Sequence, residues 1–344
     1  MKHLLIAGGG TGGHITPALA VGSEAEKYFK VSYACTPRPV DKRMYSSVSN
    51  TVHVMNPPRA DKGLKIFLPF TASYAFIKTV LLLKRIKVDI VLGTGGYSSF
   101  FAILAAKFLG LPTAVFDSNA LPGRSNRLAS KFCKIAFTSF PESEEKLSCS
   151  VVLSGTPVVD SIQNAGKETD PKQKETKVLF LGGSQGARSI NNIALSLGDK
   201  VSVLLQSGSI DFDRVQEKSS SFTNFEVKPF LDNLLPWYSA ATLVVARSGA
   251  QTIAELSALG IPAVFVPYPY AAEDHQTINA KAIANTGGAI WFPESETKLE
   301  SFVDVILNLI KDKQRLKDMA QAIKSNNKED SSQVIVFHLK ELTQ

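Results

Sequence analysis

The sequence predicts an α/β protein with two doubly wound, Rossmann-like domains. Short runs of aliphatic and β-branched residues alternate with longer amphipathic stretches, as in parallel sheets that helices cover on both faces. Glycine-rich turns follow several of these runs, and one polar stretch divides the series in two. A chain of 344 residues has room for two domains of about 100–200 residues each.

The expected strands form two series, each long enough for a separate sheet. Those of the first half are residues 2–7, 30–34, 90–92, 113–116, 135–138 and 151–153. Those of the second half are residues 177–181, 201–206, 225–227, 243–246 and 263–266.

The polar and charged stretch 164–177 contains no large apolar residue, and we expect it to be a linker or surface loop. The first domain is therefore expected over 1–160 and the second over 161–327. The tail 328–344 carries an apolar pattern at helical spacing over 334–342. We expect this tail to pack back on the first domain. Amphipathic patterns also predict helices at 299–310 and 314–325.

Charge is distributed unevenly between the halves. Residues 1–156 carry 19 basic and 9 acidic side chains, 19 − 9 = +10, whereas residues 157–344 carry 19 and 22, 19 − 22 = −3. This indicates that the first half faces an anionic partner: nucleic acid, phospholipid headgroups or a phosphorylated substrate. Nucleic acid is disfavoured because no reader motif is present.

Cysteine usage and hydropathy bear on location. The chain has three cysteines and no Cys-x-x-Cys motif, which favours a reduced, cytosolic compartment. The run at 1–7 is too short for a signal peptide. The apolar stretch 66–83 is interrupted by Pro69, Ser73 and Lys78, so it is a poor membrane span but could lie on a membrane surface.

The first expected strand ends in Gly8-Gly9-Gly10-Thr11-Gly12-Gly13-His14, followed by a helical pattern from Pro17. The glycines satisfy G-x-G-x-x-G, but no acidic residue ends the second strand and no Gly-Lys-Ser/Thr follows. A dinucleotide site and a P-loop are therefore not expected. Glycines still allow a close approach to the backbone, and N–H groups at a helix start attract phosphate.

Similar turns recur at 93–97, 182–186 and 246–250, and Glu255 lies on the helix that follows the last of them. All lie at carboxyl ends of expected parallel strands, the side on which open α/β sheets bind ligands. If the two domains face each other, these turns line an interdomain cleft. Such a cleft suits a nucleotide-diphosphate donor and a phosphorylated acceptor.

No metal site or cofactor is expected. Asp211-Phe212-Asp213 formally matches the Asp-x-Asp motif of cation-dependent transferases. We interpret these carboxylates as helix-start residues, which the helix dipole favours. No His/Cys cluster has ligand spacing.

In combination, six motifs resemble the MurG family, the GT-B fold glycosyltransferases that transfer N-acetylglucosamine from UDP-GlcNAc to undecaprenyl-linked muramyl-pentapeptide (lipid I), forming lipid II. The motifs span the chain: GGGTGGHITPALA (8–20), GTGGYSSFFAILAA (93–106), SNALPGRSNRLA (118–129), GGSQGARSIN (182–191), ARSGAQTIAEL (246–256) and EDHQTINA (273–280). The resemblance implies inverting, metal-independent transfer to the C4 hydroxyl of MurNAc during peptidoglycan synthesis. It also implies a peripheral location on the cytoplasmic face of the bacterial inner membrane, with roles in cell shape and division and possible contacts with cell-wall synthesis proteins.

The resemblance also implies a donor site, mostly in the second domain. Ser184 with the backbone of Gly183 and Gln185 would hold the diphosphate, and Glu255 would accept hydrogen bonds from the ribose hydroxyls. The remaining implied donor-site residues are Thr11, Gly12, Gly13, Asn119, Phe230, Leu231, Ser248, Gly249, Ala250, Thr252, His275, Gln276 and Asn279. Of these, Leu231 and Phe230 would meet the uracil, and Gln276 and His275 the sugar.

For the acceptor, the resemblance implies the turns of the first domain. The lipid diphosphate would meet Gly9, Gly10, Thr11, Gly95, Gly96 and Tyr97. His14 is the preferred general base because imidazole exchanges protons near neutral pH. A histidine that binds phosphate or caps the helix is the alternative, and Asp117 is the second candidate base.

Two positions depart from the family pattern. The family usually has His-Glu-Gln-Asn where this chain has Phe116-Asp117-Ser118-Asn119, so no catalytic histidine can act there. The family often has an arginine near the uracil where this chain has Val159. Uridine recognition is therefore expected to depend more on backbone contacts.

A lipid-linked acceptor implies membrane contact. The stretch 64–87 mixes bulky apolar with basic residues, as a surface-lying anchor requires. The expected contact residues are Phe67, Phe70, Phe76, Lys84 and Arg85, with ordinary core burial as the alternative. A UDP-GlcNAc epimerase, a silent binding protein and a transferase with a soluble acceptor also remain open as functions.

Overall fold

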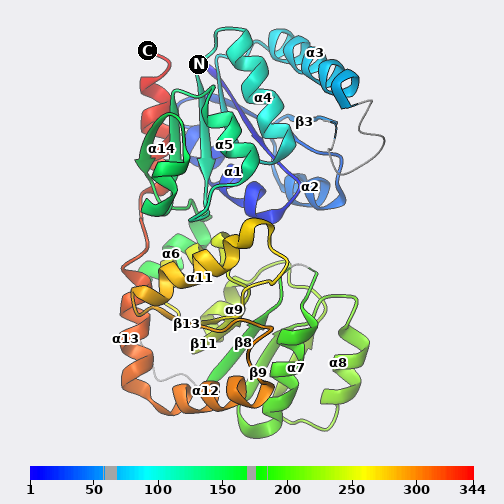
Figure 1. Ribbon diagram of the computed structural model, residues 1–344, viewed down its shortest axis with the longest axis vertical. Helices are drawn as coiled ribbons and strands as arrows, with labels where there is room; N and C mark the ends of the chain where they lie inside the picture. The colour runs from blue at the N-terminus through cyan, green and yellow to red at the C-terminus, as the bar shows by residue number, and fades with distance from the viewer. Residues whose placement is uncertain (57, 59–67, 169–175, 184) are drawn as a thin grey trace. The chain divides into compact units, whose positions relative to one another are not determined.

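The computed structural model describes residues 1–56, 58, 68–168, 176–183 and 185–344, which form two compact units (Figure 1). The first comprises Met1–Val159 and Asp330–Gln344, and the second Asp160–Glu329. Each unit is an α/β domain with its own all-parallel sheet, so the predicted fold class is confirmed.

The described part of the first unit contains a seven-stranded sheet of order β3-β2-β1-β4-β5-β6-β7. Its strands are β1 (His3–Gly8), β2 (Lys30–Cys35), β3 (Val52–Val54), β4 (Ile90–Gly95), β5 (Thr113–Asp117), β6 (Ile135–Thr138) and β7 (Ser150–Leu153). Its helices are α1 (Gly12–Ala25), α2 (Pro39–Met44), α3 (Leu68–Ile86), α4 (Gly96–Phe108), α5 (Arg124–Ser130) and α14 (Ser331–Glu341).

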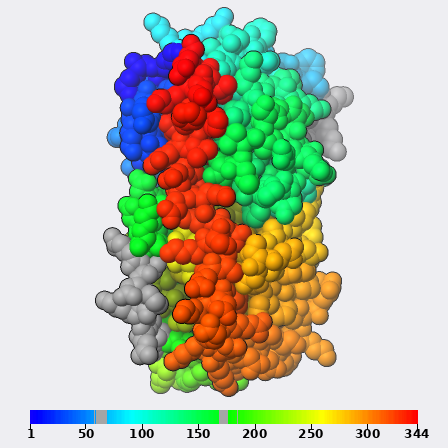
Figure 2. Space-filling model, turned by 90° about the vertical axis from the view of Figure 1, so that its left-hand side faces the viewer, coloured from blue at the N-terminus to red at the C-terminus, as the bar shows by residue number. Residues whose placement is uncertain are grey.

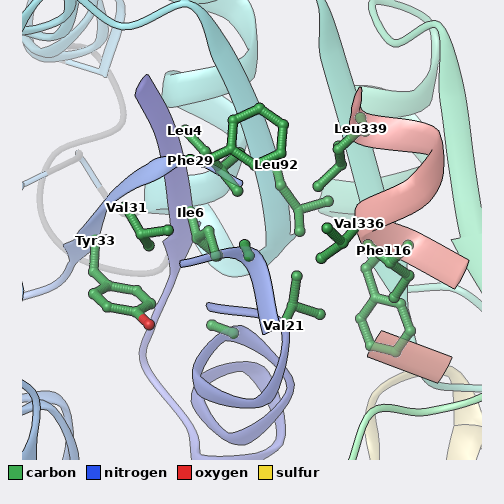
Figure 3. Packing of buried hydrophobic residues seen from close by; sticks show 14 of the residues in the cluster. Leu4, Ile6, Val21, Phe29, Val31, Tyr33, Leu92, Phe116, Val336 and Leu339 are labelled. Carbon is green, nitrogen blue, oxygen red and sulfur yellow. The ribbon is translucent and has the colours of Figure 1, made fainter. Parts of the chain in front are cut away.

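Side chains of the first sheet alternate between two cores, because successive residues of a strand point to opposite faces. Leu4 and Ile6 pack on the face covered by α1 and α14, and Leu5 and Ala7 pack on the face covered by α3 and α4. Figure 3 shows Val336 of α14 within the first of these cores. Burial on both faces explains why these strands are continuously apolar.

The C-terminal helix α14 belongs to the first unit. It contributes Ile335, Val336 and Leu339 to the core beside α1. Figure 2 shows α14, in red, between N-terminal segments in blue and segments of the same unit in green. Burial of these side chains stabilises the helix by removing its apolar stripe from water.

The described part of the second unit contains a six-stranded sheet of order β10-β9-β8-β11-β12-β13. Its strands are β8 (Lys177–Leu181), β9 (Ser202–Gln206), β10 (Phe225–Lys228), β11 (Leu243–Ala246), β12 (Ala263–Phe265) and β13 (Ala289–Trp291). Its helices are α6 (Asp160–Glu168), α7 (Arg188–Leu197), α8 (Phe212–Ser219), α9 (Leu235–Ala240), α10 (Ala250–Leu259), α11 (His275–Asn285), α12 (Leu299–Lys311) and α13 (Lys313–Lys324).

Three expectations about local structure need correction. Residues 164–168 belong to α6 rather than to a linker. Helix α6 packs closely on α10, since a Cβ on Gly166 would lie 2.1 Å from the Ala258 carbonyl oxygen. Residues 169–175 of the expected linker lie outside the described part. Helix α1 begins at Gly12, five positions before Pro17 (17 − 12 = 5). The short strands β3 and β13 were not predicted, since three residues show no clear period.

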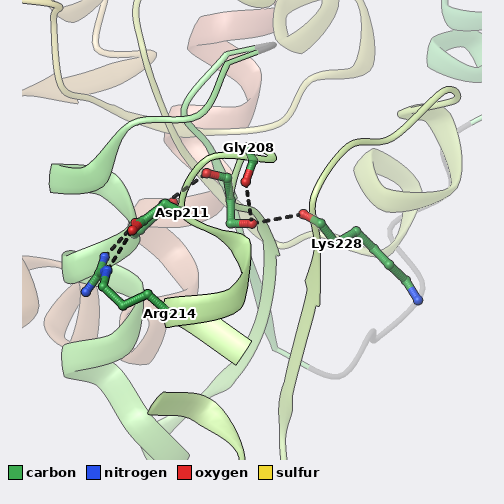
Figure 4. A network of polar contacts seen from close by, with 6 residues as sticks. Gly208, Asp211, Arg214 and Lys228 are labelled. Carbon is green, nitrogen blue, oxygen red and sulfur yellow. Dashed lines mark hydrogen bonds and ion pairs between the residues drawn. The ribbon is translucent and has the colours of Figure 1, made fainter. Parts of the chain in front are cut away.

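The Asp-Phe-Asp sequence lies at the start of α8, as predicted. Arg214 donates two hydrogen bonds of 2.6 Å to the Asp211 carboxylate (Figure 4). Asn191 donates a third at 2.8 Å. These hydrogen bonds hold the pKa of Asp211 below its usual range. Among the described residues, no group of His, Cys, Asp and Glu has the arrangement of a metal site.

None of the described helices is both long and apolar enough to cross a bilayer.

Candidate active site

The first sheet reverses its strand order between β1 and β4, which is its topological switch point. Strand β1 ends at Gly8 and is followed by Gly9–Gly13. The turn expected at 93–97 is shorter than predicted, because β4 extends to Gly95 and α4 begins at Gly96. A Cβ added to Gly95 would lie 2.6 Å from Cδ2 of His14, and one added to Gly96 would lie 2.8 Å from the Gly9 carbonyl oxygen. The sheet therefore brings together the two glycine turns that the sequence analysis assigns to the acceptor.

His14 lies between these turns. Its Nδ1 is 3.0 Å from the Gly9 carbonyl oxygen, and the Thr94 hydroxyl donates to the His14 carbonyl oxygen at 2.8 Å. A ring nitrogen that faces a carbonyl oxygen carries the proton, which leaves Nε2 as the acceptor in the neutral tautomer. The imidazole is therefore held in an orientation suited to accepting a proton at Nε2.

Asp41 of α2 fixes the first glycine turn through its side-chain carboxylate. Its carboxylate has no exposed surface and accepts hydrogen bonds from the Gly10 amide at 2.8 and 3.1 Å, and from the Thr36 amide and hydroxyl at 2.7 and 2.8 Å. Arg38 donates to the Gly10 carbonyl oxygen at 2.7 Å. Both polar groups of Gly10, whose φ is +91°, are thus fixed by side chains.

A third loop follows β5 and is organised by Asp117. One carboxylate oxygen accepts from the amide and the side-chain nitrogen of Asn119 at 2.9 and 3.0 Å. The other accepts from the Gly123 amide and from Asn126 Nδ2, both at 2.8 Å. With four donors, the buried Asp117 carboxylate determines the path of residues 117–126.

These three loops border a cavity of about 480 Å³ within the first unit. Its lining consists of His14, Pro58, Ala72, Gly96, Tyr97, Phe100, Phe101, Asp117, Asn119, Gly123, Arg124, Ser125, Asn126 and Leu128. His14, Gly96, Tyr97, Asp117 and Asn119 are thus predicted site residues that one cavity brings together. The volume lies within the range of ligand pockets, about 300–1,000 Å³.

The second sheet reverses its strand order between β8 and β11, and again two glycine-containing turns follow these strands. Gly183 and Gly186 have φ of +85° and +77°, a region that favours glycine. Gln206 Nε2 donates to the Gly183 carbonyl oxygen at 3.0 Å, and Gln206 Oε1 accepts from the Leu231 amide at 3.1 Å. One buried amide side chain therefore joins the turn to the segment that contains Phe230 and Leu231; Ser184 lies outside the described residues.

The turn after β11 is tied to α11. The Ser248 hydroxyl donates to the Gln276 carbonyl oxygen at 2.8 Å, and Asn279 Nδ2 donates to the Ser248 carbonyl oxygen at 3.2 Å. Ser248 and Asn279 are fully buried. Gln276 Oε1 accepts from the Tyr268 amide, and His275 is half-buried with its Nδ1 2.8 Å from the Ala272 carbonyl oxygen. Gly249, Ala250 and Thr252 lie at the start of α10.

Glu255 lies on α10 beside Tyr238. Its carboxylate accepts from the Tyr238 hydroxyl at 2.8 Å and from Gln251 Nε2 at 3.1 Å. Burial raises the pKa of Glu255, and the two hydrogen bonds oppose that shift. An ionised carboxylate has about four acceptor positions, so two remain for further donors.

The predicted membrane-contact residues lie mainly on α3. Phe70 is 75 % exposed, and Lys84 and Arg85 are exposed near the end of the helix. Phe76 is partly buried and packs edge-on against Phe108, with ring centroids 5.5 Å apart. Phe67 lies outside the described residues.

Several residues that hold the turns and Glu255 in place were not predicted from the sequence: Arg38, Asp41, Thr94, Gln206 and Tyr238. Asp41 lies in α2, in the connection that follows the carboxyl end of β2, and that position was the one available signal. Burial raises the pKa of Cys35 to about 11, and that of Cys133 to about 12, so these thiols stay protonated.

Comparison with known proteins places the chain among glycosyltransferases. Residues 4–138 match the glycosyltransferase family 28 N-terminal domain, and residues 177–335 match the family's C-terminal domain. The chain is 32% identical to the UDP-N-acetylglucosamine–N-acetylmuramyl-(pentapeptide) pyrophosphoryl-undecaprenol N-acetylglucosamine transferase of Lawsonia intracellularis, over 99% of this chain and 98% of that protein. A transferase of the same name from Halothermothrix orenii is 32% identical over 94% and 95% of the two chains.

Solved structures agree with this relationship. The crystal structure of Acinetobacter baumannii MurG matches with a TM-score of 0.81 and 28% identity, over 99% of this chain and all of that one (100%). The UDP-GlcNAc 2-epimerase of Neisseria meningitidis, bound to UDP-GlcNAc, matches with a TM-score of 0.73 but 17% identity, over 99% and 100% of the chains, which shows a shared fold alone. With full-length relatives above 30% identity and both domain matches, the chain belongs to the MurG family of glycosyltransferase family 28.

Proposed function

We propose that the chain transfers N-acetylglucosamine from UDP-GlcNAc to the C4 hydroxyl of the muramyl sugar of lipid I, forming lipid II for peptidoglycan synthesis. One observation carries the proposal beyond family membership. Each of the two sheets has a pair of glycine-containing turns at its switch point, where open α/β sheets bind ligands. Two such sites suit a reaction between two substrates that both contain diphosphate.

The second unit is the proposed donor domain. Gly183, Ser184 and Gln185 hold the UDP diphosphate in this proposal, and Glu255 uses its remaining acceptor positions for the ribose hydroxyls. The Gln206 bridge supports this assignment because it fixes the Leu231 backbone relative to the diphosphate turn. Ser248, Asn279 and Gln276 form a hydrogen-bonded set that orients the loop proposed to contact the sugar.

The first unit is the proposed acceptor domain. His14 is the general base in this proposal because its Nδ1 is occupied by the Gly9 carbonyl oxygen and its ring lines the cavity. Asp117 is better suited to positioning, since four donors already occupy its oxygens. Asn119 belongs to the same hydrogen-bonded loop and lies near the transferred sugar in this proposal.

The reaction as proposed inverts the anomeric configuration in one displacement. The muramyl hydroxyl attacks the anomeric carbon, His14 takes the hydroxyl proton, and UDP leaves as an anion. N–H groups at the starts of α7 and α10 would stabilise the developing negative charge.

Peripheral attachment to the cytoplasmic face of the inner membrane is part of the proposal. The exposed apolar residues Phe70, Tyr74, Ile77 and Leu81 recur every three to four positions along α3, which places them on one helix face. Lys84 and Arg85 follow, and basic residues near an anionic leaflet contribute about 1 kcal/mol each. Such a surface fits an anionic membrane that carries the lipid acceptor, and from there the enzyme would serve cell-wall growth together with other synthesis proteins.

The decisive experiment measures UDP release from UDP-GlcNAc with and without a lipid I analogue. The proposal expects release only when the acceptor is present, with a disaccharide lipid as the second product. Consumption of UDP-GlcNAc without acceptor would indicate an epimerase. Absence of release under both conditions would indicate a binding protein, and release with a soluble muramyl acceptor alone would remove the lipid from the assignment.

A further inference from the structure

The cavity of the first unit has a lining of two chemical kinds. Polar groups come from His14 in the first turn of α1, from Asp117 at the end of β5 and from Asn119 in the loop that follows. Apolar groups come chiefly from helices: Ala72 from α3, Tyr97, Phe100 and Phe101 from α4, and Leu128 from α5. A wholly polar ligand such as a sugar diphosphate would leave this apolar part of the lining without a matching partner.

The apolar part of the lining is only partly removed from water in the protein itself. Leu128 is 46 % exposed and Tyr97 is 43 % exposed, while Phe100 is half-buried and stands edge-on to the buried Phe101, with centroids 5.7 Å apart. Apolar side chains that gather in a concave, partly exposed site mark a binding surface for an apolar group. Arg124 adds a positive charge to the same lining.

Helix α3 contributes Ala72 to the lining, and Ala72 also packs against the core beneath the helix. The exposed apolar residues Phe70 and Tyr74 lie two positions away on either side, and residues two positions apart point to opposite sides of a helix. Helix α3 therefore presents Ala72 to the cavity and a separate apolar face to the outside. The same lining includes Gly96 and His14, which lie where the two glycine turns meet.

We propose that this apolar wall, defined by Ala72, Tyr97, Phe100, Phe101 and Leu128, binds the first isoprene units of a polyprenyl diphosphate. The inference rests on the proposed function and deepens it, because it assigns the hydrocarbon next to the acceptor's diphosphate to a protein site rather than to the bilayer. The polar part of the lining, to which Arg124 belongs, would bind the anionic part of such an amphiphile, and the wall would remove its proximal hydrocarbon from water.

The test measures binding directly, so that it does not depend on turnover. Calorimetric titrations compare neryl diphosphate, a short and soluble polyprenyl diphosphate, with inorganic diphosphate. The wild-type protein should bind neryl diphosphate at least tenfold more tightly, a difference of about 1.4 kcal/mol. Equal affinity for both ligands would overturn the inference.

Two variants test whether the tenfold higher affinity for neryl diphosphate comes from the apolar wall. Leu128→Ser changes a partly exposed side chain, and Phe100→Ser changes a half-buried one; each should lose most of the tenfold gain and leave the affinity for inorganic diphosphate unchanged. Phe108→Ser is the matched control, because Phe108 is a 70 % exposed phenylalanine on the same helix that does not line the cavity. A loss in Phe108→Ser equal to that in Leu128→Ser would contradict the assignment.

A competing source of hydrocarbon is an ordinary bilayer lipid. Decylphosphocholine, added below its micelle concentration, should not displace neryl diphosphate; displacement at comparable concentrations would show a general lipid site and overturn the inference. The proposed function is tested separately by UDP release with a lipid I analogue. Binding of neryl diphosphate that depends on Leu128, without UDP release, would support this inference and contradict the proposed function. UDP release without preferential binding of neryl diphosphate would support the proposed function and contradict this inference.

Discussion

Replacement of Asp41 by asparagine is the sharpest test of how the first glycine turn is held. All the groups that face the Asp41 carboxylate are donors: the Gly10 amide, the Thr36 amide and the Thr36 hydroxyl. Asparagine has nearly the same shape but brings an NH₂ group to one of these positions. The more favourable orientation of the asparagine side-chain amide keeps its oxygen toward Thr36. Its NH₂ group then faces the Gly10 N–H, so that two hydrogen-bond donors oppose each other.

The expected cost follows from that count. One charge-assisted hydrogen bond is lost, worth about 1.5–3 kcal/mol. The Gly10 amide keeps only the longer contact with the remaining side-chain oxygen, which is 3.1 Å in the wild type. If about 2 kcal/mol of this appears as weaker binding of the acceptor diphosphate, kcat/KM for the acceptor falls about 30-fold. The KM for UDP-GlcNAc should stay within about twofold, because Asp41 belongs to the first unit and the proposed donor site to the second.

The assay is steady-state UDP release with each substrate varied in turn. Asp89→Asn is the matched control, because Asp89 also accepts a backbone N–H of the β1 segment, from His3 at 2.6 Å, but at the opposite end of the strand. It should lower the free energy of unfolding without changing the acceptor KM. An acceptor kcat/KM within threefold of wild type in folded Asp41→Asn protein, or an equal effect of Asp89→Asn, would refute the reasoning.

Four further outcomes are expected. His14→Ala should lower kcat at least 100-fold with little change in either KM, as removal of a general base costs about 10²–10⁴ in rate; a kcat within threefold would exclude the base assignment. Gly95→Ala should distort the acceptor turn, since the φ of Gly95 is +119° and a Cβ there would lie 2.6 Å from the His14 ring. The melting temperature should fall and the acceptor KM should rise. An unchanged acceptor KM would contradict the role given to the close contact between Gly95 and His14. Burial raises the pKa of Glu255, so between its ordinary pKa and the raised one the native state binds more protons than the unfolded chain. The free energy of unfolding therefore falls as pH rises through that range. In urea unfolding across pH, Glu255→Gln should show a shallower fall than the wild type, and the same pH dependence in both proteins would contradict the buried Glu255 assignment. Replacing Phe70 and Leu81 together by serine should reduce co-sedimentation with anionic vesicles but leave turnover of a soluble short-chain acceptor intact, and unchanged sedimentation would reject α3 as the contact surface.

Local patterns predicted most of the strands and where the chemistry should lie. The apolar runs that became β1, β4, β8 and β11 are buried on both faces, so their composition reports their environment directly. Glycine turns after those strands were visible because a close approach of backbone to ligand, or of turn to turn, leaves no room for a side chain. The same reasoning failed at residues 164–168, where the polar surface of α6 hides a helix whose packing depends on Gly166.

Composition and period thus determined two parallel-sheet domains, the turn positions and the family motifs, because each of these depends on residues close together in the sequence. The strand order decided the rest. Only the adjacency of β1 and β4 brings Gly95 against His14, some eighty positions away, and only the folded β2–α2 connection places Asp41 under Gly10. Which carboxylate is occupied by donors, and which aromatic side chains share a cavity, are consequences of contacts between distant segments, and no local pattern of residues encodes them.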